Sequence, residues 1–368
     1  MSTLVVSDLH LGARSGIDLL RRPPVLEALL DGLEGVDALV LLGDVVELRD
    51  GPVGEALALA RPVLERLGER LGDRTVTIVP GNHDHRLIAP WLERRRGTED
   101  PLGPEQRLEP ADASEAARAI ARFLAPARVE VAYPGLWVAD GVYATHGHYL
   151  DRHITVPAFE PLGLRAIERL QRRRGALPDG VDGYEAILAP VLALLHELAQ
   201  TAPPPSPGAR HGGPSARAYR VLTRGAGGRR SLRDRLVADV GFPVAVAGLN
   251  RLGLGPVRAD VSGPELRRSS LRAMGEVVRR LDVGAGHVLF GHTHRTGPLA
   301  RDAGSEWTAP SGARLHNCGS WVVERFLGGP APQDSPYRAG GAVLLDGEPP
   351  RLLRLLDDPR LLSAPHPA

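Results

Sequence analysis

Five short polar motifs each stand directly after an apolar run, and this arrangement constrains the fold more than any other feature. The motifs are Asp8-Leu9-His10, Gly43-Asp44-Val45-Val46-Glu47, Gly81-Asn82-His83-Asp84, His146-Gly147-His148 and Gly291-His292-Thr293-His294. The runs before the first three, at 3–7, 37–42 and 75–79, are rich in Val, Leu and Ile and predict buried strands. Because the carboxyl ends of strands in an open α/β sheet converge on one crevice, we expect all five motifs to meet in a single site.

The fold class follows from the elements between these strands. Amphipathic stretches near 24–34 and 53–71 each open with proline, and the resulting alternation of strand and helix predicts an α/β fold with a largely parallel sheet. Further short strands, with hairpins toward the C-terminus, are expected at 128–132, 136–139, 142–145, 287–290, 313–317, 320–324 and 341–345.

The interval 150–285 has a different character, with almost no strand signal. Helical patterns occur there near 160–174, 184–200, 229–239 and 264–281. A segment rich in proline and glycine at 202–214 cannot continue a helix and predicts a linker. We therefore expect a catalytic domain made of 1–149 and 286–357, an inserted helical cap at 150–285, and a flexible tail at 358–368.

The residue types in the motifs suit a metal centre. Carboxylate and amide oxygens occur with several imidazoles and no thiolate, a donor set that favours borderline cations such as Mn²⁺, Fe or Zn²⁺, and Mn²⁺ is the expected metal. Each motif alone also fits an ordinary turn, since glycine and short polar side chains commonly end strands. The hypothesis of a metal centre depends on all five motifs occurring in order.

The set resembles the calcineurin-like metallophosphoesterase superfamily, whose pattern is D-x-H, G-D-x-x-[DE], G-N-H-[DE], an H before G, and G-H-x-H. The resemblance covers 1–148 and about 286–325, including Asn317-Cys318-Gly319-Ser320, and it implies two packed mixed β-sheets flanked by helices. The cap is not covered. Glu47 replaces an Asp found in other members, and with Arg295 it makes the chain similar to the branch that contains UDP-2,3-diacylglucosamine hydrolases.

The resemblance also implies a role for each motif residue. Asp8, His10, Asp44 and His294 would bind a first metal, while Asp44, Asn82, His146 and His292 would bind a second, with Asp44 bridging. His83 resembles the general acid of the family, and Asp84 is expected to orient its imidazole. Two close cations can clamp phosphoryl oxygens and share a hydroxide, which would attack in line and cleave a phosphoester or pyrophosphate bond.

Other polar residues near the motifs are weaker candidates. His148, Arg14 and Arg295 could contact substrate phosphate, although solvated surface or a satisfied core position accounts for each as well. All 45 basic residues are Arg, so arginine clusters carry little information; one of them, at 217–235 in the cap, could bind an acidic headgroup. The apolar stretch 184–198 favours burial in the cap over membrane contact or dimerisation.

Composition limits the remaining functions. A net charge of +1 and an aromatic content of 4% provide no groove for nucleic acid, which argues against a nuclease. The substrate is then a phosphorylated small molecule, or alternatively a lipid-linked nucleotide pyrophosphate reached by peripheral membrane contact through the cap. A non-catalytic metal-binding scaffold is the alternative of another class.

The single cysteine, Cys318, fits a cytoplasmic location. The oligomeric state is not encoded in these motifs.

Overall fold

The structure is a computed structural model. It describes residues 1–97, 100–155, 159–173, 175–201, 262–323, 334–347, 349–358 and 360–363, together with isolated residues between 247 and 260. The predicted helix at 229–239, the linker at 202–214 and the arginine cluster at 217–235 lie outside the described residues.

The first half of the sheet is built on the three strands that the apolar runs predict. β1 (Thr3–Val6), β2 (Ala38–Leu42) and β3 (Thr75–Val79) are parallel neighbours, with Thr3 opposite Ala38 and Ala38 opposite Thr75. β9 (Gly341–Leu345) and β10 (Arg351–Arg354) extend this half as an antiparallel pair beside β1. Prediction of β1, β2, β3 and β9 is confirmed, whereas β10 was not anticipated.

One long strand, β5 (Arg128–Ala139), joins this half of the sheet to a second half. Its first part is parallel to β3, and its last part is antiparallel to β6 (Val142–Thr145). β7 (His287–Phe290) and β8 (Arg314–Asn317) then follow β6 in parallel, and β4 (Glu105–Leu108), which was not anticipated, pairs with β5. The two strands predicted at 128–132 and 136–139 are therefore a single strand.

The two halves pack face to face. A buried apolar cluster contains side chains of β1, β2 and β3 together with side chains of β6, β7 and β9, among them Val5, Leu42, Ala144, Leu289 and Val343. The prediction of two packed mixed sheets is confirmed, with the addition that β5 makes them continuous. The predicted strand at 320–324 is wrong in its described part, where Val322 forms only an isolated bridge to Asp18.

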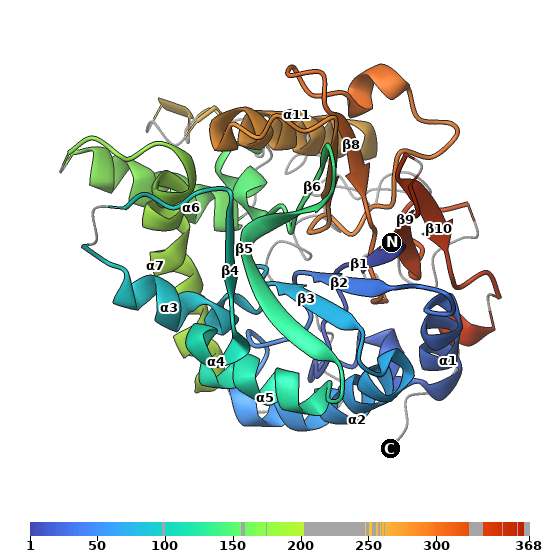
Figure 1. The fold of residues 1–368 in the computed structure, drawn as a ribbon. Helices are drawn as coiled ribbons and strands as arrows, with labels where there is room; N and C mark the ends of the chain where they lie inside the picture. The colour runs from blue at the N-terminus through green and yellow to red at the C-terminus, as the bar shows by residue number, and fades with distance from the viewer. Residues whose placement is uncertain are drawn as a thin grey trace, which may run out of the picture.

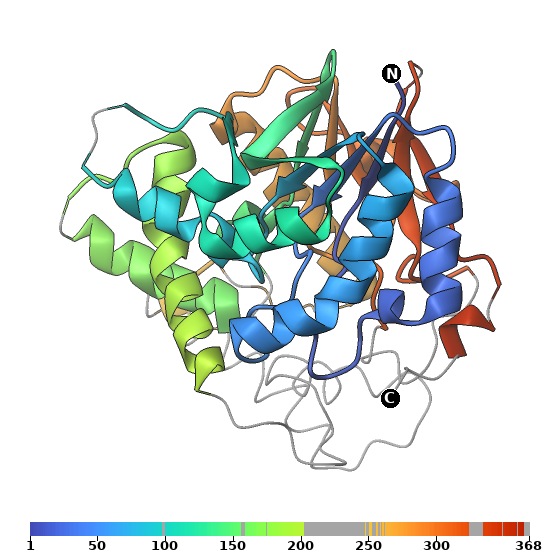
Figure 2. The same ribbon diagram turned by 60° about the horizontal axis from the view of Figure 1, so that its bottom comes forward.

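Helices cover the outer faces of both halves (Figure 1). α1 (Pro23–Gly32), α2 (Val53–Leu71) and α5 (Glu115–Phe123) pack on the first half, and Figure 2 shows them side by side. α11 (Gly263–Leu281) packs on the second half, in one apolar cluster with β7 and β8. Serine side chains begin two of these helices: Ser114 accepts a hydrogen bond from the Ala117 amide and Ser262 from the Glu265 amide.

The other α-helices in the described part of the chain lie at the end of the molecule beside β4 (Figure 1). They are α3 (Ala89–Arg94), α4 (Pro110–Ala113), α6 (Phe159–Arg172) and α7 (Gly180–Gln200). α6, α7 and α11 agree with helices predicted for the cap, but the boundaries of the cap as a domain stay a prediction. None of the described helices has both the length and the hydropathy needed to cross a bilayer.

Candidate metal centre

All five motifs lie at the carboxyl ends of parallel strands. Asp8 follows β1, Asp44 follows β2 and Asn82 follows β3, while His146 and His292 follow β6 and β7 in the other half of the sheet. The two halves face each other, so their strand ends open toward the same place. The expected convergence is therefore present.

The backbone at four of the predicted ligands is not extended. Asp8, His10, His292 and His294 all have φ between 47° and 65°, in the left-handed region. The reason is that the chain turns sharply after each strand, and the Asp8 amide, for example, donates to the Gly43 carbonyl 3.1 Å away.

Two motif glycines are required by how closely the polar side chains approach the backbone. A Cβ atom at Gly43 would lie well within 3.0 Å of the His146 ring, and Gly43 also has φ of 83°. A Cβ atom at Gly291 would lie well within 3.0 Å of Ser7 and of the Asp8 carboxylate. Glycine therefore precedes the donor residues because any side chain would displace them.

A first cluster of donor atoms contains Asp8, His10 and His294. The His294 Nε2 atom lies 3.2 Å from Asp8 Oδ1 and 3.3 Å from His10 Nε2. The His10 Nε2 atom lies 3.7 Å from Asp44 Oδ2. Four of the seven predicted ligands thus present their donor atoms to one small volume.

A second cluster contains Asp44, Asn82, His146 and His292. The Asn82 Oδ1 atom lies 3.2 Å from His146 Nε2 and 3.1 Å from His292 Nδ1. The same His146 Nε2 atom lies 3.3 Å from Asp44 Oδ2. Because Asp44 contacts both clusters, the structure brings all seven predicted ligands together as two groups with one shared carboxylate.

The electrostatics of the two clusters fit bound cations. Burial alone would raise the pKa of the Asp44 carboxyl, but the imidazoles of His146 and His83 outweigh it and hold that pKa well below its ordinary value. Burial lowers the pKa of His146, and the Asp44 carboxylate overcomes this and raises it to about 9. A divalent metal ion can supply the positive charge that stabilises these buried carboxylates. Neutral imidazole nitrogens and the amide oxygen of asparagine also bind such ions.

Glu47 contacts the predicted general acid. The His83 Nδ1 atom lies 2.8 Å from Glu47 Oε2, and His10 Nδ1 lies 2.9 Å from the same oxygen. Burial would raise the pKa of the Glu47 carboxyl, yet His83 and His10 together hold it below its ordinary value. Glu47 therefore accepts hydrogen bonds from one predicted metal ligand and from the predicted acid, and it fixes the orientation of both rings.

Asp84 does not orient His83, which corrects the sequence-based expectation. Its carboxylate accepts hydrogen bonds from the backbone amides of Gly81, at 2.6 Å, and Val45, at 2.7 Å. Burial, and next the charge of Asp44, raise the pKa of Asp84 to about 6. The motif spacing is compatible with either partner for His83, but Asp84 points inward and ties the loop after β3 to the loop after β2.

Asp151 is a residue of the site that the sequence motifs did not predict. Its Oδ1 atom lies 3.1 Å from His292 Nε2, on the opposite side of the ring from the Nδ1 atom that faces Asn82. Asp151 lies in a short 3-10 helix, His148–Arg152, that follows the His146 motif, and its side chain is 13% exposed. In the sequence, the one indication of its role is its position five residues after His146.

Replacing Asp151 by Ala is expected to weaken binding at the second cluster by about 10- to 100-fold, the usual effect of removing a carboxylate that orients a metal-binding histidine. Isothermal titration calorimetry with Mn²⁺ measures this affinity directly. Asp151→Asn keeps an acceptor oxygen and should recover part of the loss. Two unchanged binding steps in the Ala variant, with an unchanged melting temperature, would show that His292 needs no such support.

The other candidate substrate-binding residues are not in the donor clusters. His148 is 1% exposed and packs against the rings of His146 and Tyr149, and burial together with His146 lowers its pKa well below the ordinary value. Arg295 is also buried; its Nη2 atom donates to Asp302 at 2.8 Å, and its guanidinium lies over Trp307. Arg14 donates to Glu55.

Two packed mixed sheets with buried Asp, Asn and His donors at their strand ends define a class of metal-dependent hydrolases. The family model described as calcineurin-like phosphoesterase matches residues 1–296, so the chain belongs to that family and is a metal-dependent phosphoester hydrolase. The match spans all five motifs and the helical interval between the fourth and the fifth.

Comparison with individual proteins adds little to the family assignment. No curated protein matches the sequence. Among solved structures, the cold-active protein-tyrosine phosphatase of a psychrophilic Shewanella species is similar at 14% identity and a TM-score of 0.28, over 94% of this chain and 75% of that chain. Another structure of a cold-active protein tyrosine phosphatase has 12% identity and a TM-score of 0.27, over 94% and 73% of the two chains.

Proposed function

We propose that the chain cleaves a phosphoester or pyrophosphate bond at a centre of two divalent metal ions, with Mn²⁺ as the expected metal. Asp8, His10, Asp44 and His294 would hold the first ion, and Asp44, Asn82, His146 and His292 would hold the second. The observation that carries this proposal is the position of Asp44, whose Oδ2 atom lies 3.7 Å from His10 Nε2 and 3.3 Å from His146 Nε2. A carboxylate between two donor clusters is the residue type that bridges paired cations.

The bound ions supply Lewis-acid chemistry to the phosphoryl group and to the attacking water. His83 has the geometry of a general acid, because its side chain is 30% exposed and borders the donor clusters. With Nδ1 held by Glu47, the Nε2 atom is left to deliver a proton to the leaving oxygen.

A panel assay tests the reaction. Mn²⁺-loaded protein is offered matched phosphomonoesters, phosphodiesters and pyrophosphates, with a chelated sample as the control. We expect hydrolysis of at least one class, abolished by the chelator and restored by Mn²⁺. Inactivity across the panel with two metals bound per chain would instead favour the non-catalytic scaffold.

A second candidate substrate is a lipid-linked nucleotide pyrophosphate at a membrane surface. The observation that favours it is the exposure of three leucines on the helices beside the site: Leu170 is 50% exposed, and Leu194 and Leu198 are each 59% exposed. Co-sedimentation with anionic vesicles tests it. Binding that is lost in the Leu194→Glu, Leu198→Glu double variant would favour this substrate, and no sedimentation of the unaltered protein would remove it.

A further inference from the structure

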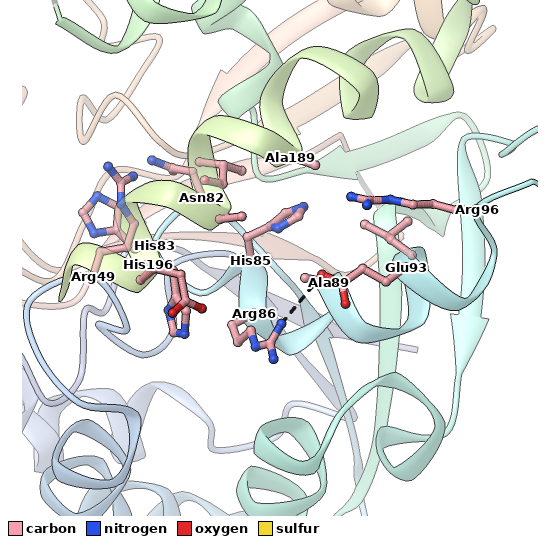
Figure 3. A pocket seen from close by; sticks show the side chains of 14 residues that line it. Arg49, Asn82, His83, His85, Arg86, Ala89, Glu93, Arg96, Ala189 and His196 are labelled. Atoms are coloured by element: carbon pink, nitrogen blue, oxygen red, sulfur yellow. Dashed lines mark ion pairs between the residues drawn. The ribbon is translucent and has the colours of Figure 1, made fainter. Parts of the chain in front are cut away.

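A small cavity adjoins the donor clusters on the side of His83. It has a volume of about 90 Å³ and is lined by the loop after β3, by α3 and by one face of α7. In Figure 3, His83 and Arg49 lie at one end of the cavity and Arg96 lies at the other, with His85 between them. A group that receives a proton from His83 would lie beside the His83 end of the cavity, because His83 lines it.

The helix that forms the cavity wall is anchored on both sides of it. Near the start of α7, Glu185 is buried and accepts hydrogen bonds from the hydroxyls of Tyr133 and Tyr149, at 2.5 Å and 2.6 Å. The His85 Nε2 atom lies 3.2 Å from the other Glu185 oxygen. This ties α7 to the segment that carries Asn82 and His83.

The other end of α7 is tied to the loop after β2. His196 Nδ1 donates to the Leu48 carbonyl at 3.1 Å, and the Gln200 side chain accepts from the Val53 amide at 3.0 Å. The loop after β2 also carries Asp44 and Glu47. The part of α7 between its two anchors is therefore held at a fixed place over the cavity.

Small side chains occupy that fixed part. Ala189, Leu192 and Ala193 line the cavity from the helix face that also carries Glu185 and His196, because residues spaced by three or four share a face. The next residue, Leu194, is 59% exposed and does not line the cavity. The space beside His83 therefore exists because two alanines stand where larger side chains would fill it.

The part of the cavity away from His83 carries a net positive charge. Arg86 and Arg96 line it with Glu93 (Figure 3). The Arg86 Nη1 atom lies 3.9 Å from Glu93 Oε1, and both side chains are about half exposed, at 43% and 52% (Figure 3). An exposed pair at this distance is weak, so an anion of the substrate can replace Glu93 at little cost.

We propose that this cavity is the leaving-group pocket of the enzyme, and that it accepts a compact organic group bearing a negative charge. Ala189 and Ala193 set the size of that group, and Arg86 contacts its anion. This inference rests on the proposed function, because it takes His83 as the acid that protonates the leaving group. It assigns specificity to α7, a helix that carries no candidate metal ligand.

Binding of phosphonates to the Mn²⁺-loaded protein tests the inference without requiring turnover. The test uses three ligands: methylphosphonate, phenylphosphonate and 4-carboxyphenylphosphonate. All three present the same phosphonate group to the metals, and the group that would enter the pocket grows from methyl to phenyl to carboxyphenyl. We expect the affinity to rise along this series. Ala189→Phe should lower the affinity for the two aryl compounds by about 10-fold or more, the scale of steric discrimination in such pockets, and should leave methylphosphonate within about 3-fold.

Two further variants complete the experiment. Leu194→Phe places the same phenyl side chain on the exposed face of α7 and should change none of the three affinities. Arg86→Gln should lower the affinity for the carboxyphenyl compound by about 3- to 5-fold relative to the phenyl compound, as expected for an exposed charge contact. Ala193→Phe, at the other alanine that lines the cavity, replaces Ala189→Phe if the latter lowers the melting temperature.

The outcomes separate the two proposals. Equal losses for methyl and aryl phosphonates in Ala189→Phe, or an unchanged preference in Arg86→Gln, would overturn the pocket assignment while hydrolysis by the unaltered protein still stands. Selective binding that follows the expected pattern, in a protein that hydrolyses no ester of the panel, would retain the pocket and reject the proposed reaction.

Discussion

Replacing Asp44 by Asn is expected to lower kcat by roughly 1,000-fold or more, because it removes the one carboxylate shared by both donor clusters. The Asp44 Oδ1 atom accepts a hydrogen bond from the His83 amide at 2.8 Å, and an asparagine carbonyl oxygen can keep this bond. The loss is therefore mainly one of negative charge between two cations. Several kcal/mol of transition-state stabilisation come from such paired ions, and each 1.36 kcal/mol corresponds to about tenfold in rate.

Metal content and turnover are measured together for this variant. Elemental analysis should give fewer than two Mn²⁺ ions per chain after gel filtration, alongside the fall in kcat. Asp140→Asn is the matched control, since Asp140 is exposed and lies outside both clusters, and it should match the unaltered protein. Full metal content with normal turnover in Asp44→Asn would mean that the two clusters do not share a bridging ligand.

Replacing His83 by Ala is expected to reduce hydrolysis of alkyl phosphates by about 10²–10⁴-fold, the usual contribution of a general acid. The reduction should be much smaller for nitrophenyl esters, because nitrophenolate leaves without being protonated. Mn²⁺ content should stay near two ions per chain. Steady-state kinetics on the two ester types, with the substrate class chosen from the panel, measures the difference.

Glu47→Gln is the companion variant for this experiment. Its carboxylate contacts both His83 and His10, so its loss should reproduce part of the leaving-group dependence and also weaken the first metal site. Tyr143→Phe is a control variant outside the site. It removes the hydrogen bond from the Tyr143 hydroxyl to the Pro104 carbonyl, and it should leave the rates for both ester types unchanged. Equal losses for alkyl and nitrophenyl esters in His83→Ala would exclude the acid role.

The strands and the convergence of the motifs could be predicted from the sequence because both depend on local patterns. Buried parallel strands are continuous apolar runs, and β1, β2 and β3 appear where those runs stand. β4 and β10 lack that signal: β4 is the four-residue sequence Glu105–Leu108, which is mostly polar, and β10 is an edge strand that begins and ends with arginine. Their pairing depends on neighbours distant in the chain.

The partners of the site residues were harder to predict than the residues themselves. Asp84 and Glu47 are both acidic and both close to His83, but only the direction of the turn after β3 decides which of them meets the ring. Arg295 follows the last motif directly, yet the buried carboxylate of Asp302 and the Trp307 ring hold it away from the donor clusters. No spacing in the sequence encodes these orientations.

The left-handed backbone at the motifs links metal supply to the lifetime of the folded chain. Among the described residues, six other than glycine have positive φ, and five of them are predicted ligands: Asp8, His10, Asp44, His292 and His294. Each such residue costs on the order of 1 kcal/mol, a large share of a net stability of roughly 5–15 kcal/mol. Ions that bind only the folded chain return free energy in proportion to the logarithm of their concentration. A cell starved of metal would thus lose the enzyme to unfolding and proteolysis as well as to inactivity, so abundance and activity would fall together.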